Sequence, residues 1–419
     1  MIAQTDLDAA IAKARRRLIP FLFLLYIVAY LDRINVGFAS LQMNEALGFS
    51  PAIYGFGAGL FFIGYALFEV PSNVILARVG ARRWIARIMI TWGFVSSAMI
   101  FVRTPAAFYA LRFLLGLAEA GFFPGIIFYL TQWFPSRERA RTVAAFMTAT
   151  LAAGVVGGPI SGALLTLNGF GGLAGWQWVF LLEGMPAVLL AFVVLRVLAD
   201  GPRDAAWLSP QDREALLASL EAEARVGVEH RPLDALLQPR VWLLAIVYFT
   251  IPVCSYGVGF WLPQILKSSS GSSDLVVGLL SAVPYGVGAT GMMVVGRHSD
   301  RTGERRWHLL LSALVSAAGL VMAAAGSGLP WMLTALSIAT LGYASMYGPF
   351  WALATMAMRG TGAAASIALI NSIGNTGGFV GPYLLGAINT ATHSFAAGLV
   401  AIAAIVAVGA SVVLFIRES

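Results

Sequence analysis

The strongest constraint on this chain is a series of about twelve apolar stretches, each long enough to cross a bilayer as a helix of about 20 residues. Hydrophobic residues make up 59% of the 419 residues and charged residues only 11%, too few to cover a soluble surface. We therefore predict an all-α membrane protein with twelve transmembrane helices, and exclude a cytosolic enzyme, a disordered chain and a nucleic-acid binder. The predicted spans are residues 18–46, 53–77, 84–102, 106–134, 141–166, 176–198, 241–267, 275–297, 307–327, 330–356, 363–389 and 394–416.

Arginines concentrate in alternate loops between these spans, and the remaining loops carry almost no charge. Cytoplasmic loops retain Lys and Arg, so both termini are predicted to be cytoplasmic. The basic positions are Arg15, Arg16, Arg17, Arg78, Arg82, Arg83, Arg87, Arg137, Arg139, Arg141, Arg297, Arg301, Arg305 and Arg306.

One long segment, residues 199–240, is polar and lies between the first six spans and the last six. Ser209 followed by Pro210 is typical of a helix start, with Ser as N-cap and Pro at the first helical position. We predict a short amphipathic helix from there to about Arg225, in a cytoplasmic connector. The chain thus divides into a six-helix half at 1–198, the connector at 199–240 and a second six-helix half at 241–419.

The two halves share sequence motifs at a constant offset. Residues 78–84 and 301–307 both read R-x-G-x-R-R-W, and residues 154–159 and 377–382 both read G-x-x-x-G-P; each pair is 223 residues apart. Two matches at one offset predict homologous halves in parallel orientation, between which a site can open to one side at a time. The Arg-rich turns are candidate gating elements, or simply positive-inside charge; their residues are Arg78, Gly80, Arg82, Asp300, Arg301, Gly303 and Arg305.

These repeats, with the turn at 296–303, resemble the major facilitator superfamily. The segments Leu31-Asp32-Arg33-Ile34-Asn35, Arg112 to Gly121 and Phe123-Pro124-Gly125 are similar to its anion:cation symporter branch, which includes bacterial tartrate, phthalate and galactonate carriers. The resemblance covers nearly the whole chain. It implies the major facilitator fold, a multi-pass protein of the bacterial inner membrane, and proton-coupled transport of a small organic anion.

Four charges fall inside predicted spans of the first half: Asp32, Arg33, Arg112 and Glu119. A charge at mid-bilayer is costly and is a functional hypothesis by default. The 223-residue offset maps them to Ser255, Tyr256, Ala335 and Gly342, so the fold itself does not require them. Arg binds a carboxylate through a planar fork, which makes Arg33 and Arg112 candidate anion ligands. Asp32 and Glu119 can titrate and are candidate proton-coupling residues; the alternative is two ion pairs that hold spans one and four together.

Weaker candidates complete a substrate site. Tyr30 lies near Arg33, and the resemblance to galactonate carriers implies substrate contacts for Tyr65, Trp351 and Asn371. Asn375 is four residues from Asn371 and shares its helix face. Each of these also has a packing explanation, and we interpret Glu69 and Glu183 as structural or gating residues.

Nothing in the sequence indicates catalysis, a cofactor or a metal site. The one cysteine and four histidines form no zinc or redox spacing. The sequence therefore predicts a monomeric, proton-coupled symporter that imports a small organic carboxylate, such as a tartrate- or phthalate-like dicarboxylate or a sugar acid, and has protons and the lipid bilayer as its other partners. Two alternatives stay open: an organic-phosphate or anion exchanger of the same fold, and a non-transporting membrane sensor.

Overall fold

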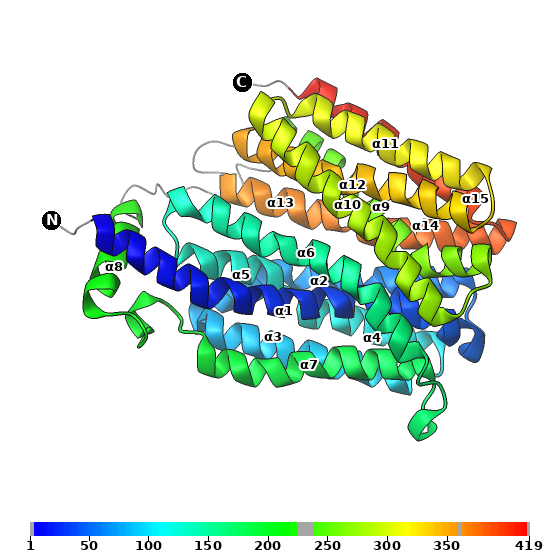
Figure 1. Cartoon of the computed structure of the whole chain (residues 1–419), viewed down its shortest axis with the longest axis horizontal. Helices are drawn as coiled ribbons and strands as arrows, with labels where there is room; N and C mark the ends of the chain where they lie inside the picture. Colours follow the sequence, from blue (N-terminus) through cyan, green and yellow to red (C-terminus); the bar gives the residue numbers. More distant parts are fainter. Residues whose placement is uncertain (1–3, 225–237, 358–362, 417–419) are drawn as a thin grey trace.

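The computed structural model describes residues 4–224, 238–357 and 363–416, and these residues form a bundle of long helices (Figure 1). The two ends of the described chain lie at one end of the bundle, called here the terminus end; the opposite end is the far end. The helices are α1 Gln4–Leu47, α2 Pro51–Val79, α3 Ala81–Ser97, α4 Pro105–Glu119, α5 Phe122–Thr131, α6 Ser136–Leu165, α7 Gly175–Val197, α8 Pro210–Ala224, α9 Pro239–Ser270, α10 Asp274–Thr302, α11 Arg306–Ala325, α12 Leu329–Ala357, α13 Ala363–Asn375, α14 Gly377–Thr392 and α15 Ala396–Ser411.

The predicted all-α membrane fold is confirmed. Within the described residues, eleven helical segments are long and apolar enough to cross a membrane. The remaining predicted span, 363–389, is covered by α13 and α14, which are separated at Thr376. Helices α1–α7 occupy the lower part of Figure 1 and α9–α15 the upper part, as two halves of one bundle.

The connector contains the expected helix, α8, which packs against α1. The Ser209 hydroxyl accepts a hydrogen bond from the Asp212 backbone N–H at 3.2 Å, as an N-cap does. Lys13 of α1 donates to the Asp212 carboxylate at 2.6 Å, and this bond together with the Ser209 hydroxyl lowers the pKa of Asp212. The expected end at Arg225 lies outside the described residues, and the division at 199–240 stays a prediction.

The fourth predicted span, 106–134, is broken where a continuous helix was expected. Helix α4 ends at Glu119, Gly121 adopts a left-handed φ of 87°, and α5 begins at Phe122. The carbonyl freed at Ala120 accepts the Ser72 hydroxyl at 2.7 Å, which satisfies a backbone group that lipid cannot. The break leaves Glu119 as the last residue of a helix, where the helix dipole disfavours a carboxylate and a cationic partner is needed.

The two halves are in closest contact at the far end. Tyr54 of α2 donates to the Phe260 carbonyl of α9 at 2.8 Å, and Gln42 of α1 donates to the Asp274 carboxylate of α10 at 2.7 Å. Gly158 of α6 lies so close to α10 that an added Cβ would collide with the Gly278 carbonyl, whereas a Cβ at Gly286, nearer the terminus end of α10, would meet nothing within 4 Å. These contacts hold the two halves together at the far end.

Candidate functional site

A buried ion pair between Arg33 and Glu119 is the centre of the candidate site. Arg33 comes from α1 and Glu119 from the end of α4, and Arg33 Nη2 donates to Glu119 Oε1. Their side chains are 11% and 1% exposed. Two of the predicted residues are therefore brought together, with opposite charges that neutralise each other away from water.

Aromatic side chains surround the Arg33 guanidinium. The Phe61 and Tyr65 rings of α2 each lie 5.3 Å from it, within range of a cation–π interaction. Across the interface, Arg33 Nη1 donates to the Tyr256 hydroxyl of α9 at 3.3 Å. Arg33 Nε is buried without a hydrogen-bond partner in the described residues. Arg33 therefore keeps donors for an anion, at a point where the two halves meet.

Arg112, the second predicted anion ligand, is fully buried on α4. Its Nη2 donates to the Ala58 carbonyl at 3.2 Å, and the Phe61 ring lies 5.2 Å from its guanidinium. Among the described residues no carboxylate forms an ion pair with it, because Glu119 pairs with Arg33 instead. Its Nε and Nη1 have no partner in the described part of the chain, so Arg112 provides positive charge beside the pair.

Asp32 lies beside Arg33 in sequence but faces a different side of α1. Its Oδ1 accepts from the Ser96 hydroxyl of α3 and from the Asn35 amide at 3.1 Å. The structure thus separates the two predicted proton-coupling residues: Glu119 contacts an arginine, and Asp32 contacts only neutral polar groups.

The weaker candidates occupy both halves. Tyr30 is half-buried next to Tyr26, with ring centroids 6.5 Å apart. Trp351 is half-buried against Tyr248 and Phe350, at 5.0 and 5.2 Å. These contacts place aromatic rings in both halves of the protein. They are consistent with substrate binding and equally with ordinary packing.

The predicted asparagines lie on α13. Asn371 donates to Glu69 Oε1 of α2 at 2.7 Å, and Ser372 donates to Glu69 Oε2 at 3.4 Å. Asn375, at the end of α13, is half-buried. Glu69 is buried. Its carboxylate binds Asn371 across the interface between the halves, nearer the terminus end than the contacts of Tyr54 and Gln42. We name this contact the Glu69 latch.

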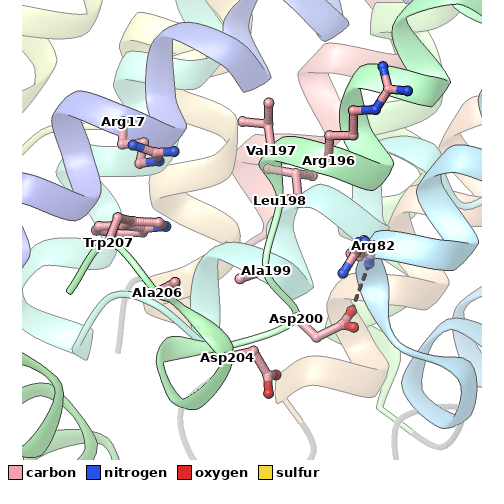
Figure 2. Close-up of a pocket in the computed structure, with 10 residues that line it drawn as sticks. All are labelled: Arg17, Arg82, Arg196, Val197, Leu198, Ala199, Asp200, Asp204, Ala206 and Trp207. Carbon is pink, nitrogen blue, oxygen red and sulfur yellow. Dashed lines mark hydrogen bonds between the residues drawn. The ribbon is translucent and has the colours of Figure 1, made fainter. Parts of the chain in front are cut away.

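The two Arg-rich turns are held by acids of different origin. In the second half, Arg305 donates to the Asp300 carboxylate at 2.7 Å, and Gly303 has a φ of 72°. In the first half, where the offset places Ala77, the acid is Asp200 of the connector, which accepts from the Arg82 backbone N–H at 2.9 Å (Figure 2). Gly80 beside it has a φ of 95°, and the predicted gating residues Arg78 and Arg301 are exposed.

Asp200 also lines a pocket of about 600 Å³ at the terminus end of the first half (Figure 2). Arg17 lies over the Trp207 ring at 5.4 Å, and Arg82 and Arg196 complete the basic lining. The pocket is remote from the Arg33–Glu119 pair and lies where the connector meets α1, α3 and α7.

Three contacts were not expected from the sequence: Phe61 under both arginines, Tyr256 as a partner of Arg33, and Asp200 at the first turn. The internal repeat carried a signal for Tyr256, because the 223-residue offset equates it with Arg33. No motif in the sequence indicated the roles of Phe61 and Asp200.

Comparison with known proteins identifies the type of protein that has this architecture. Residues 22–382 match the Major Facilitator Superfamily. A protein named "Putative tartrate transporter" from Agrobacterium vitis is 51% identical, over 99% of this chain and 96% of its own. A "Quinolone resistance transporter" from Acinetobacter baumannii is 43% identical, over 91% and 89%.

A solved structure has the same fold. An inward-facing bacterial homologue of the human lysosomal transporter Spinster superposes with a TM-score of 0.78, covering 96% of both chains at 18% identity. The family and these relatives are transporters and not enzymes, and the many apolar helices place the chain in the plasma membrane as a multi-pass protein.

Proposed function

Because this chain belongs to the major facilitator superfamily, we propose that it is a proton-coupled symporter that imports a small organic carboxylate by alternating access. The observation that carries the proposal is the Arg33–Glu119 pair, buried at the interface of the two halves with Tyr256 of the second half on Arg33. The tartrate name of the Agrobacterium relative supports a hydroxy-dicarboxylate as the substrate class.

The pair supplies a direct link between proton and anion. While Glu119 is ionised, it occupies the Arg33 fork. Protonation of Glu119 removes this competing charge, and the guanidinium can then bind a substrate carboxylate through two charge-assisted hydrogen bonds. Arg112 adds positive charge nearby, and Tyr65 offers a hydroxyl. Loss of the proton restores the internal pair and displaces the substrate.

Alternating access follows from the contacts between the halves. With Arg-rich loops in the cytoplasm, the far end is extracellular, and contact between the halves there corresponds to a conformation facing the cytoplasm. Here the Glu69 latch holds Asn371 until substrate binds. The turns around Arg82 and Arg305 then move with their own halves as rigid bodies.

The test is uptake into proteoliposomes of the purified chain, with external pH recorded as tartrate, phthalate, galactonate, succinate, glycerol phosphate or a quinolone is added. We expect alkalinisation with a carboxylate. We also expect Glu119→Gln to abolish pH-driven uptake while leaving exchange of labelled for unlabelled anion intact.

One alternative keeps the same fold and site. An anion exchanger, including one for organic phosphates, also needs two arginines but no titrating carboxyl. Exchange of labelled anion without proton movement in the wild type would favour it over the symporter, and Glu119 would then be only the structural partner of Arg33.

A further inference from the structure

The pocket at the terminus end of the first half has the size and lining of a binding site (Figure 2). Its volume of about 600 Å³ is within the range of small-ligand sites. Arg17, Arg82 and Arg196 line it, one each from α1, α3 and α7. Trp207 of the connector stacks on the buried Trp133, with ring centroids 5.4 Å apart, and forms one wall. We name this pocket the arginine pocket.

The three arginines of the arginine pocket differ from other cations near the terminus end. Arg15 of α1 and Arg203 of the connector each pair with a glutamate. Within the described residues, the guanidiniums of Arg17, Arg82 and Arg196 form no ion pair with any carboxylate. Their charge is therefore available to a ligand.

Two acids share the lining but leave it positively charged. Asp200 accepts from the Arg82 backbone N–H at the start of α3, where the helix dipole favours a carboxylate. Asp204 is exposed, and in Figure 2 it lies at the opposite edge from Arg17 and Arg196. Three cations therefore face two carboxylates, and an anion is favoured on the side of Arg17 and Arg196.

An exposed apolar stripe on α7 leads to the arginine pocket. Leu182 and Leu189 precede Arg196 by fourteen and seven residues, which is about four and two helical turns, and Phe192 precedes it by about one turn. These three apolar side chains are 42%, 62% and 52% exposed, and we name them the α7 stripe. Helix α7 lies along the edge of the bundle in Figure 1, and the Arg196 side chain extends outward from the rim in Figure 2. The α7 stripe therefore places lipid directly beside an arginine.

We propose that the arginine pocket binds the phosphate of an anionic phospholipid, while an acyl chain lies along the α7 stripe. The planar fork of a guanidinium matches a phosphate, and basic pockets between transmembrane helices bind anionic headgroups. A soluble phosphate would use the same arginines but would gain nothing from the stripe. The site is remote from Arg33, so this inference is independent of the proposed substrate and proton coupling.

The experiment is a titration of the purified full chain in detergent with phosphatidylglycerol or phosphatidylcholine, with bound lipid counted by native mass spectrometry. We expect phosphatidylglycerol to bind more tightly. Arg17→Gln, Arg82→Gln and Arg196→Gln should each weaken its binding about fivefold, the factor for one arginine at an anionic headgroup. Arg16→Gln and Arg83→Gln remove the same charge from exposed neighbours outside the lining and are the controls. Equal effects of controls and pocket variants, or equal binding of the two lipids, overturn the proposal.

A second comparison distinguishes a lipid from a soluble phosphate. Phosphatidylglycerol in nanodiscs should raise the Tm of the wild type, because a ligand of the folded state stabilises it; millimolar inorganic phosphate in phosphatidylcholine nanodiscs should not. Leu189→Ser should weaken phosphatidylglycerol binding, whereas Leu311→Ser, at a 56% exposed position of α11, should leave it unchanged. Stabilisation by inorganic phosphate that Arg196→Gln removes would overturn the lipid assignment. Lipid binding in a protein without proton-driven uptake would refute the symport proposal and leave this site standing.

Discussion

Arg33→Lys tests the central assumption that the Arg33 guanidinium binds the substrate carboxylate. In the structure Nη2 is bound to Glu119, Nη1 makes only a 3.3 Å bond to Tyr256, and Nε has no partner in the described residues. Once Glu119 is protonated, the fork can offer two parallel donors, whereas lysine keeps the charge but offers no paired donors. A hydrogen bond to a charged group contributes about 1.5–3 kcal/mol. Losing one should therefore weaken binding about 10- to 150-fold.

The assay is calorimetric binding of tartrate to purified protein, together with the KM of uptake. Lysine preserves a charge opposite Glu119, so the protein should still fold; Arg33→Ala would leave that carboxylate unpaired, at a cost of about 3–5 kcal/mol. Arg103→Lys, on an exposed arginine bonded to backbone carbonyls at the far end, is the matched control. If Arg33→Lys binds tartrate as tightly as the wild type does, Arg33 is not the anion ligand.

Three further predictions follow from contacts outside the ion pair. Glu69→Ala removes the latch between the halves, so the distance between spin labels on the loops before α3 and α11 should increase. Glu69→Gln, which can still accept from Asn371, should retain most of the contact; an unchanged distance in Glu69→Ala would count against a latch. Gly158→Ala must displace α10 at the far-end contact and should lower both Tm and uptake, whereas Gly286→Ala, in open space, should do neither; equal effects of the two would contradict the packing argument. The pKa of Asp212 is lowered in the folded state, so its stabilisation of α8 is present above the unfolded pKa of about 3.9 and is lost as pH falls through the folded value. Hydrogen exchange in α8 should rise on acidification by an amount equivalent to about 1 kcal/mol or less, and Asp212→Asn should abolish that dependence.

The sequence predicted the transmembrane helices well. The length and hydropathy of a segment are local properties, and they decide whether the segment can span the hydrocarbon core of a bilayer. The break between α4 and α5 was not predicted, although Gly121 was visible. A glycine inside an apolar stretch ends a helix only if another group satisfies the freed carbonyl, and here that group is Ser72, from a different helix.

The residues of the site were more predictable than their partners. Arg112 and Glu119 are seven residues apart, which is nearly two turns of a continuous helix, yet the partner of Glu119 is Arg33, which reaches it from α1. Consecutive residues on a helix differ in direction by about 100°, so Asp32 and Arg33 could have been expected to face different surroundings. Which surroundings these are depends on the tertiary packing, because Ser96 of α3 reaches Asp32 and Glu119 of α4 reaches Arg33.

The contact between Arg33 and Tyr256 joins two positions that correspond to each other in the internal repeat. In an ancestral dimer of identical halves, a residue on such a symmetry axis would face its own copy. An arginine there would have met a second arginine, and a tyrosine a second tyrosine. A binding point with one cation and one hydroxyl therefore requires two halves of different sequence. An artificial dimer of the first half alone would place two like charges where this chain has one.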